Sequence, residues 1–111
     1  MALSRELMAA SAPSLILSLL AGGESYAYAL IRRVRDVSGG EIAWNQGTLY
    51  PALRRMEEQG LIRSRWEASG AGQRRRYYVI TDAGRAMLRD QQAQWRVVQE
   101  TLARLWGTQP A

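Results

Sequence analysis

One segment of the sequence predicts a helix with a single buried face, and this constrains the fold more than any other feature. In residues 47–62, GTLYPALRRMEEQGLI, the apolar side chains of Leu49, Leu53 and Met56 recur at helical spacing. The polar residues between them therefore point away from the buried stripe. Gly60 is typical of a residue just beyond a helix end, because glycine adopts the left-handed conformation without strain.

Two short strands around a basic turn follow this helix. Residues 61–66 alternate in the manner of a strand, residues 69–72 are rich in Ser and Gly, and residues 77–80 alternate again. Three consecutive arginines, Arg74 to Arg76, stand at the start of the second strand. A helix followed by an arginine-lined hairpin is the outline of a winged helix, so we predict an α+β, mainly helical, winged helix-turn-helix fold.

Two helices are predicted upstream. Residues 3–21 carry a broad apolar face, and Pro13 is expected either to kink this helix or to start a second segment after Ser11. Ser25 is a suitable N-cap for a second helix that extends to about Val37.

The starts of the third and last helices are predicted from capping residues. Residues 41–44 are expected to be a short extended piece, and Asn45 to cap the third helix. Because proline is tolerated mainly in the first turn of a helix, Pro51 suggests that the regular helix begins nearer Thr48, after an irregular entry. Thr81 is expected to cap the last helix.

The last predicted helix, residues 82–107, has a regular heptad pattern that we call the seam. The seam consists of Gly84, Leu88, Gln91, Trp95, Val98, Leu102 and Leu105. A lone winged helix leaves such a surface uncovered, so we predict a homodimer. Its interface would contain Leu88, Trp95, Val98, Leu102 and Leu105. Residues 1–81 would form the winged-helix domain, residues 82–107 the dimerisation helix and residues 108–111 a loose tail.

The composition excludes most enzyme classes. Cysteine and histidine are both absent, which removes disulfides, thiol nucleophiles, imidazole bases and nearly all zinc or haem ligation. We therefore predict no catalytic residue, no metal site and no cofactor. The net charge is +5, and every basic residue is arginine, a side chain suited to phosphates and guanine edges. The apolar run in residues 15–21 is too short to span a bilayer, and we expect a cytoplasmic protein.

The third helix is the predicted recognition element. Thr48 and Tyr50 near its start and Arg54 one turn later would face the major groove of double-stranded DNA. In the alternative reading this is a solvated surface, on which Arg54 pairs with Glu57 or Glu58 for about 0.2–0.5 kcal/mol. The DNA reading is favoured because the hairpin places a second basic element on the same side.

The three arginines of the hairpin cannot all face one surface, because neighbours in a strand point to opposite sides. Arg76 shares its parity with Tyr78 and Ile80 and is expected inside, so Arg74 and Arg75 are the predicted phosphate contacts. Charge that protects an edge strand from aggregation is the alternative. The full set predicted to contact DNA is Tyr26, Gln46, Thr48, Tyr50, Arg54, Arg55, Arg74 and Arg75.

Trp95 lies in the middle of the seam. A tryptophan there is more often a packing anchor than a ligand platform. The sharper hypothesis is that two such rings, related by the dimer axis, form the walls of an apolar slot for a planar aromatic molecule. Trp44, Trp66 and Trp106 are predicted to lie in the core or in an interface.

Several segments together resemble the PadR-like transcriptional regulators, a winged-helix family. The resemblance rests on the segments SYAYALIRRV, GTLYPALRRMEEQGLI, RRRYYVIT and DAGRAML and covers essentially the whole chain. A single long C-terminal helix resembles the short, multidrug-sensing subclass, in which this helix and the N-terminal helix exchange across a two-fold dimer. The resemblance implies a ligand pore lined by Leu7, Ser14, Ser18, Trp95, Val98 and Gln99.

The predicted function is a homodimeric repressor that places two recognition helices in successive major grooves of a near-palindromic operator, roughly 34 Å apart. A planar hydrophobic ligand at the dimer centre would release the DNA. A winged-helix module that binds another protein without sequence-specific DNA binding is the alternative, because a fold does not dictate its task. A soluble protein that sequesters drugs is a third reading, which also uses Trp95.

Overall fold

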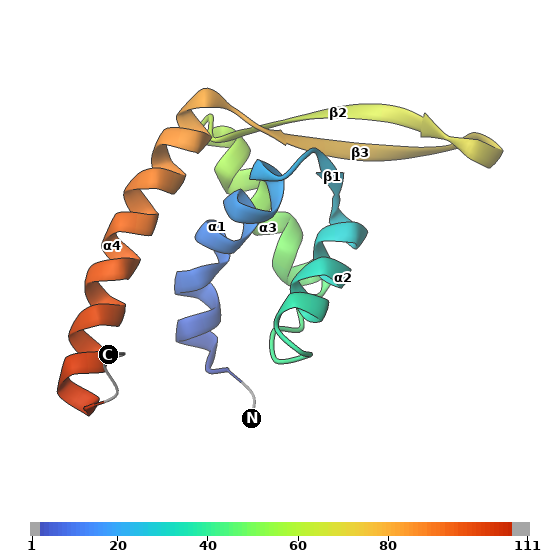
Figure 1. Cartoon of the computed structure of the whole chain (residues 1–111). Helices are drawn as coiled ribbons and strands as arrows, with labels where there is room; N and C mark the ends of the chain where they lie inside the picture. Colours follow the sequence, from blue (N-terminus) through green and yellow to red (C-terminus); the bar gives the residue numbers. More distant parts are fainter. Residues whose placement is uncertain (1–2, 108–111) are drawn as a thin grey trace.

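Four α-helices and a small three-stranded antiparallel sheet make up the fold (Figure 1). The computed structural model describes residues 3–107, apart from the side chains of residues 69 and 71. The elements in chain order are α1 (Arg5–Ala21), β1 (Ser25–Tyr26), α2 (Ala27–Val37), α3 (Gln46–Glu58), β2 (Ile62–Ser69), a 3-10 turn (Gly70–Gly72), β3 (Gln73–Ile80) and α4 (Asp82–Trp106). The sheet has the order β1-β3-β2. The predicted mainly helical winged-helix fold is confirmed.

The core lies where α1, α2, α3 and the base of the sheet meet. Its largest fully buried side chains are Ile16, Leu17, Leu20, Leu30, Leu49, Leu53 and Ile62. Leu49, Leu53 and Met56 form the buried stripe of α3, as their spacing predicts. Trp44, in the irregular segment before α3, is buried and confirms its assignment to the core. Because α3 is held by one stripe, its opposite side stays exposed.

The first helix is continuous despite a proline in its interior. Pro13 lies inside α1, and the helix extends to Ala21 without the predicted break after Ser11. A guanidinium nitrogen of Arg33, in α2, donates to the carbonyl oxygen of Leu19 at 3.2 Å. This bond satisfies one of the carbonyls that the end of a helix leaves without a partner.

Ser25 does not cap the second helix, and that prediction is wrong. Ser25 is buried in β1, where it pairs with Tyr78 of β3. The helix begins at Ala27, and its N-cap is Tyr26, whose side chain makes no capping hydrogen bond. Strand pairing and burial outweigh a cap that contributes about 1 kcal/mol.

The third helix begins at Gln46 rather than near Thr48, so the predicted irregular entry is wrong. Asn45 is the predicted cap, and its Oδ1 accepts a hydrogen bond from the backbone N–H of Thr48 at 2.9 Å. The helix continues through Pro51. Gly60 follows the last turn with a φ of 77°, which confirms its predicted role in ending the helix.

The hairpin formed by β2 and β3 is longer than predicted and extends well beyond the helices (Figure 1). Its pairs extend from Ile62 opposite Ile80 to Ser69 opposite Gln73. The three arginines at 74–76 lie within β3, which begins at Gln73.

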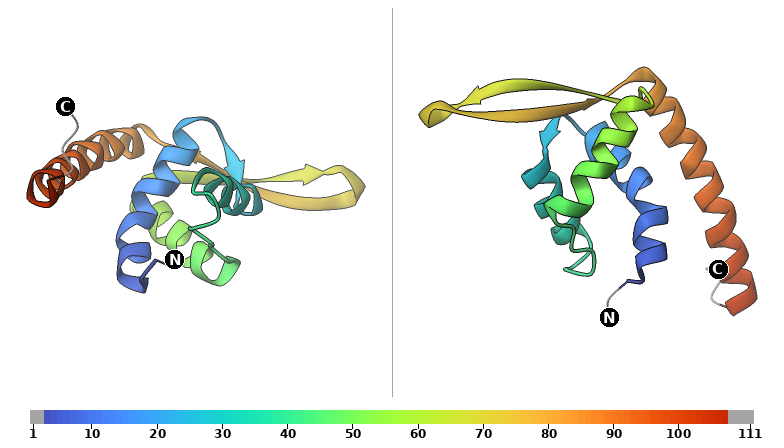
Figure 2. Two further views of the ribbon diagram at one scale, coloured as in Figure 1. Left: turned by 60° about the horizontal axis from the view of Figure 1, so that its bottom comes forward. Right: turned by 180° about the vertical axis from the view of Figure 1, so that it is seen from behind.

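The last helix runs alongside α1, on the side of the molecule away from the hairpin tip (Figures 1 and 2). Thr81 caps it as predicted, since its Oγ1 accepts from the N–H of Gly84 at 3.0 Å. Gly84 lies directly against the backbone of Leu61, and no side chain fits between them. The predicted tail at 108–111 lies outside the described residues.

Candidate nucleic-acid interface

The side of α3 opposite the core carries most of the predicted recognition residues. Gln46, Thr48, Tyr50, Arg54 and Arg55 are all exposed. The Thr48 hydroxyl donates to Asn45 Oδ1 at 3.1 Å and so belongs to the cap of the helix. This side of α3 faces the viewer in the right-hand view of Figure 2, below the base of the hairpin.

Arg54 keeps its charge free for a ligand. In the part of the chain that the structure describes, no carboxylate lies within ion-pair distance of its guanidinium, so the local pairing with Glu57 or Glu58 is not formed. Glu57 instead accepts from Arg76 at 3.2 Å and from the hydroxyl of Ser64 at 2.8 Å.

A cleft of about 150 Å³ separates α3 from the base of the hairpin. Its walls are Tyr50, Arg54 and Glu57 from α3 and Arg76 and Tyr78 from β3. Burial raises the pKa of the Tyr78 hydroxyl, and the nearby charge of Arg76 partly opposes this. Because Glu57 in the same lining is bonded to Arg76, Arg54 is the guanidinium of the cleft that remains available to an anion.

Arg76 is not inside the protein, and this prediction is wrong. Its side chain is 41% exposed and lies between α3 and β2. The Nε of Arg76 donates to Ser64 Oγ at 2.8 Å, while Nη2 donates to Glu57. Arg76 does lie on the same face of the strand as Tyr78 and Ile80, as predicted, but the core does not extend as far as this position.

Arg74 and Arg75 lie on opposite faces of the hairpin. The guanidinium carbon of Arg75 lies 4.2 Å from the centre of the Tyr26 ring, and that ring packs edge-on against Tyr77 at 5.5 Å. This pair of predicted DNA contacts, Tyr26 and Arg75, therefore lies away from the α3 cleft. The structure brings together Tyr50, Arg54 and the other α3 residues but not these two.

An ion pair lies near the base of the hairpin, on the face that carries Arg75. Both oxygens of Glu24, in the link after α1, accept from Arg65 of β2, at 2.6 and 2.8 Å. Arg65 also donates to Glu67 at 3.0 Å. The hydrogen bonds from Arg65 hold the pKa of the Glu24 carboxyl below its usual value.

Trp66 is a residue that sequence reasoning missed. It is 55% exposed, so it does not lie in the core, and its alternative assignment to an interface stays a prediction. Its ring lies 5.3 Å from the guanidinium carbon of Arg74 and 5.7 Å from that of Arg76. The alternation of residues 61–66, continued into the rest of β2, was the signal that places Trp66 on the same face as these arginines.

The predicted ligand residues gather around Trp95. Its indole Nε1 donates to Ser14 Oγ at 3.1 Å, and Ser14 donates to Gln91 Oε1 at 2.8 Å. Leu7, Ser14, Ser18 and Trp95 line one groove of about 340 Å³. Val98 and Gln99 line two neighbouring grooves that also contain Ser14 and Trp95.

The predicted seam divides into a buried and an exposed part. Leu88 belongs to the core of its own protomer and is 8% exposed, so it has little surface left for a partner. Leu102 is half-buried. Val98 is 46% exposed, Leu105 76% and Trp106 70%, so Trp106 does not lie in the core of this chain.

Among the described residues, no helix has the length and apolar character that crossing a bilayer requires.

The chain is similar to proteins of one family over most of its length. The sequence profile of the PadR-like family of transcriptional regulators matches residues 16–90. The crystal structure of a PadR family transcriptional regulator from Eggerthella lenta is 38% identical with a TM-score of 0.79, and the match covers 94% of this chain and 88% of that one. A transcriptional regulator from Clostridium thermocellum is 27% identical with a TM-score of 0.81, over 89% of this chain and 96% of that one.

A curated relative, the transcriptional regulator YqjI of Escherichia coli, is 29% identical over 87 residues. The match covers 78% of this chain and 40% of that protein, so the chain spans less than half the length of this relative. The proteins in these comparisons are regulators and not enzymes. Because the profile matches well over half of the sequence, the chain belongs to the PadR-like family of transcriptional regulators and is a DNA-binding regulator.

Proposed function

We propose that the protein is a homodimeric repressor that binds a near-palindromic operator and is released from it by a planar hydrophobic ligand. The observation that carries the proposal is the cleft between α3 and the hairpin, with Arg54 and Arg76 on its two walls. Arginine forks are the commonest specific contacts to guanine and also bind phosphates. Residues 1–81 would bind DNA, and α4 would join two copies.

In this proposal α3 lies in the major groove. Gln46, Tyr50, Arg54 and Arg55 are exposed along the side of α3 that the core leaves free, which supports their role as contacts. Arg54 would donate two parallel hydrogen bonds to a guanine edge, because no carboxylate among the described residues neutralises it. The hairpin would contact the flanking phosphate backbone.

The exposed apolar side chains of α4 support a dimer. Val97, Val98, Leu105 and Trp106 are between 46% and 76% exposed in the isolated chain. Apolar surface of this kind is usually covered in a soluble protein. We place the interface on the second half of α4, because Leu88 in the first half already packs in its own core. A two-fold axis there would set the two α3 helices about one DNA turn, roughly 34 Å, apart.

The grooves around Trp95 support a ligand at the dimer centre. They lie between α1 and α4 and are lined by the side chains that would face a second copy. A ligand that binds there and changes the angle between the two copies would change the distance between the α3 helices. Linkage requires that such a ligand and the operator weaken each other's binding.

The central experiment is a fluorescence-anisotropy titration of the protein with its own promoter region and with a scrambled duplex, at several salt concentrations. We expect a preference for the promoter of at least about 10³-fold, the lower end of the range for specific DNA-binding proteins. Arg54→Ala should remove most of that preference. Equal affinity for both duplexes would favour the protein-interaction reading instead.

Three further measurements test the finer parts of the proposal. Sedimentation velocity at micromolar concentration should show a dimer, and a stable monomer would refute the arrangement of two recognition helices. Transcription in vitro from the promoter should fall when the protein is added. Planar aromatic molecules should quench the fluorescence of the protein less in Trp95→Ala than in the wild type, and they should displace the operator.

A further inference from the structure

The two faces of the hairpin differ in what they contact. In antiparallel strands, residues directly opposite each other point to the same face, and neighbours along a strand alternate. Trp66 lies opposite Arg76, and Arg74 is the next residue of β3 on that face. We call this the inner face, because Tyr78 and Ile80 continue it into the core. The outer face carries Arg63, Arg65, Glu67 and Arg75.

The inner face is the one that continues the α3 cleft. Arg76 belongs to the wall of the cleft, together with Arg54 of α3. The outer part of the hairpin, residues 65–76, contributes two arginines and no carboxylate to this face. Its guanidiniums lie beside a half-exposed tryptophan ring, with Arg74 at 5.3 Å and Arg76 at 5.7 Å from the ring centre.

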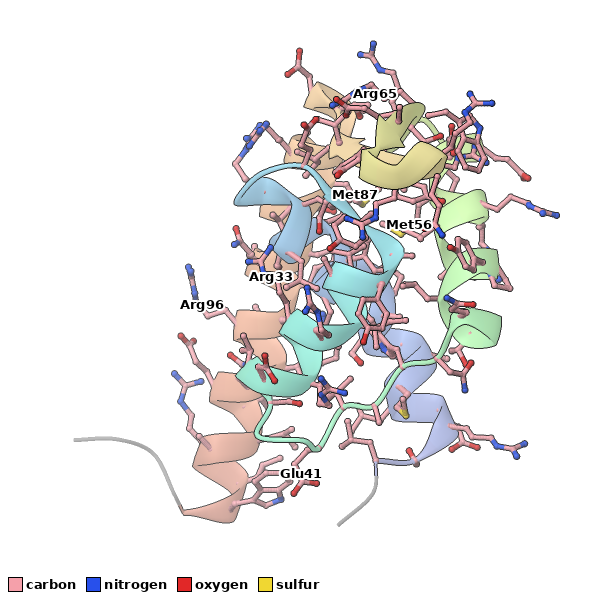
Figure 3. All side chains as sticks on the ribbon, turned by 90° about the vertical axis from the view of Figure 1, so that its right-hand side faces the viewer. Arg33, Glu41, Met56, Arg65, Met87 and Arg96 are labelled. Carbon is pink, nitrogen blue, oxygen red and sulfur yellow. The ribbon has the colours of Figure 1, made fainter. Side chains whose placement is uncertain are left out.

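Arg65 and Arg75 of the outer face already have partners within the protein. Arg65 is held by Glu24 and Glu67, and the Arg75 guanidinium lies over the Tyr26 ring at 4.2 Å. Arg63, opposite Val79, lies on this face as well, so its three arginines outnumber the two carboxylates, and the choice of face rests on position rather than on charge. Figure 3 shows Arg65 at the top of the molecule, on the far side of the hairpin from the helices. A duplex that contacts α3 meets the hairpin on the side nearer α3, so the outer face is poorly placed for it.

We propose that the inner face of the hairpin is its DNA-binding surface, and that the Trp66 ring positions the Arg74 guanidinium on a backbone phosphate. The inference rests on the proposed binding of α3 to the operator and goes beyond it by naming the face and the positioning residue. It replaces Arg75 with Arg74 as the phosphate contact nearest the tip.

Stacking on a ring leaves an arginine able to bind phosphate. The flat face of the guanidinium contacts the ring, while its five N–H donors point outward in the plane. The ring restricts the rotamers of a long side chain before the ligand arrives, which lowers the entropy cost of binding. Arg76 is already bonded to Glu57 and Ser64, whereas no carboxylate of the described residues pairs with Arg74. Arg74 is therefore the free cation of this face.

A matched pair of variants tests the choice of face. Arg74→Ala and Arg75→Ala remove the same charge from adjacent positions on opposite faces. For Arg74→Ala we expect an affinity for the promoter duplex about tenfold lower. The logarithm of the affinity falls with the logarithm of the salt concentration, and the steepness of this fall should decrease by about 0.9 for each protomer bound. Arg75→Ala should lower the affinity about twofold or less, with little change of slope. Equal losses, or a larger loss for Arg75→Ala, would overturn the assignment.

A double-mutant cycle tests the positioning role of Trp66. Trp66→Ala should weaken binding severalfold in the wild type but add nothing in the Arg74→Ala background, because both changes remove the same contact. Trp66→Phe keeps a ring face and should restore most of the affinity. Additive losses would show that Trp66 acts without Arg74 and would refute the positioning role. Since Trp66 is 55% exposed, the melting temperature should stay near that of the wild type.

The failure of this inference can be told from the failure of the proposed function. If Arg54→Ala removes binding while Arg74→Ala, Trp66→Ala and Arg75→Ala all bind like the wild type, then α3 binds the operator and the inner-face assignment is wrong. If the wild type does not distinguish the promoter from a scrambled duplex, the proposed function itself is wrong.

Discussion

Adding a single methyl group at Gly84, by the substitution Gly84→Ala, should lower the stability of the fold substantially. An added Cβ would lie 2.7 Å from Cγ1 of Ile80 and 3.1 Å from the carbonyl carbon of Leu61, and it would overlap the Leu61 oxygen. The obstacle is mainly backbone, so a change of rotamer cannot relieve it. Gly84→Ala must therefore push α4 away from the base of the hairpin.

Two opposing effects set the magnitude. Overpacking a tight site costs about 1–3 kcal/mol, and a backbone obstacle argues for the upper end. Alanine favours a helix interior over glycine by about 1 kcal/mol, which offsets part of that cost. The net loss is about 2 kcal/mol, which lowers the melting temperature of a domain of this size by about 10 °C.

Thermal unfolding followed by circular dichroism measures this loss. The protein concentration must be fixed, because any assembly makes the melting temperature depend on it. Ala83→Gly is the control: Ala83 is exposed in the same turn of α4, so this change reports only the helix-propensity effect of about 1 kcal/mol. An unchanged or higher melting temperature for Gly84→Ala would refute the close approach of α4 to Leu61.

Three further predictions follow from single contacts. Asn45→Ala removes the acceptor of the Thr48 N–H and should cost about 1 kcal/mol in thermal unfolding, whereas Asn45→Asp keeps an acceptor and should not. Leu53→Ala empties a fully buried site and should cost about 2–5 kcal/mol in urea unfolding; a loss below 1 kcal/mol, on the order of a surface change, would contradict the core packing. The Glu24 carboxyl should titrate below 4.5 by NMR, because Arg65 stabilises its ionised form. The stabilisation of the folded state by ionised Glu24 is then complete above pH 4.5 and is lost as the pH falls through the lowered pKa of the folded protein. A pKa of 4.5 or higher for Glu24 in the folded protein would contradict this.

Capping residues in the sequence were sufficient to predict where several helices begin or end. Asn45 and Thr81 cap α3 and α4 as predicted, and Gly60 ends α3, because each effect depends on only a few neighbouring residues. The two prolines were harder to place. Pro13 and Pro51 each cost about 3 kcal/mol in an isolated helix, but both helices are packed along their length in this fold and continue through them.

At Ser25 the capping propensity of the residue is outweighed by strand pairing with a residue far away in the sequence. Its hydroxyl suits an N-cap, and nothing near it in the sequence argues otherwise. The residue that decides its structure is Tyr78, more than fifty positions away, with which it pairs in the sheet. Sequence patterns report the propensity of a segment but not the partner that tertiary structure supplies.

The prediction of burial was wrong at Arg76 and at Trp66 for a similar reason. The alternation of the strands assigned their face correctly, and the error lay in assuming that the core extends that far. The helices cover the hairpin only near its base, around Ile62 and Ile80, so residues four or more positions further out on the same face lie in solvent. Single exposed apolar side chains are common on protein surfaces, so exposure alone assigns no role to Trp66. The proposed role of Trp66 rests instead on its contacts, because two guanidiniums lie beside the ring on the face that leads to α3.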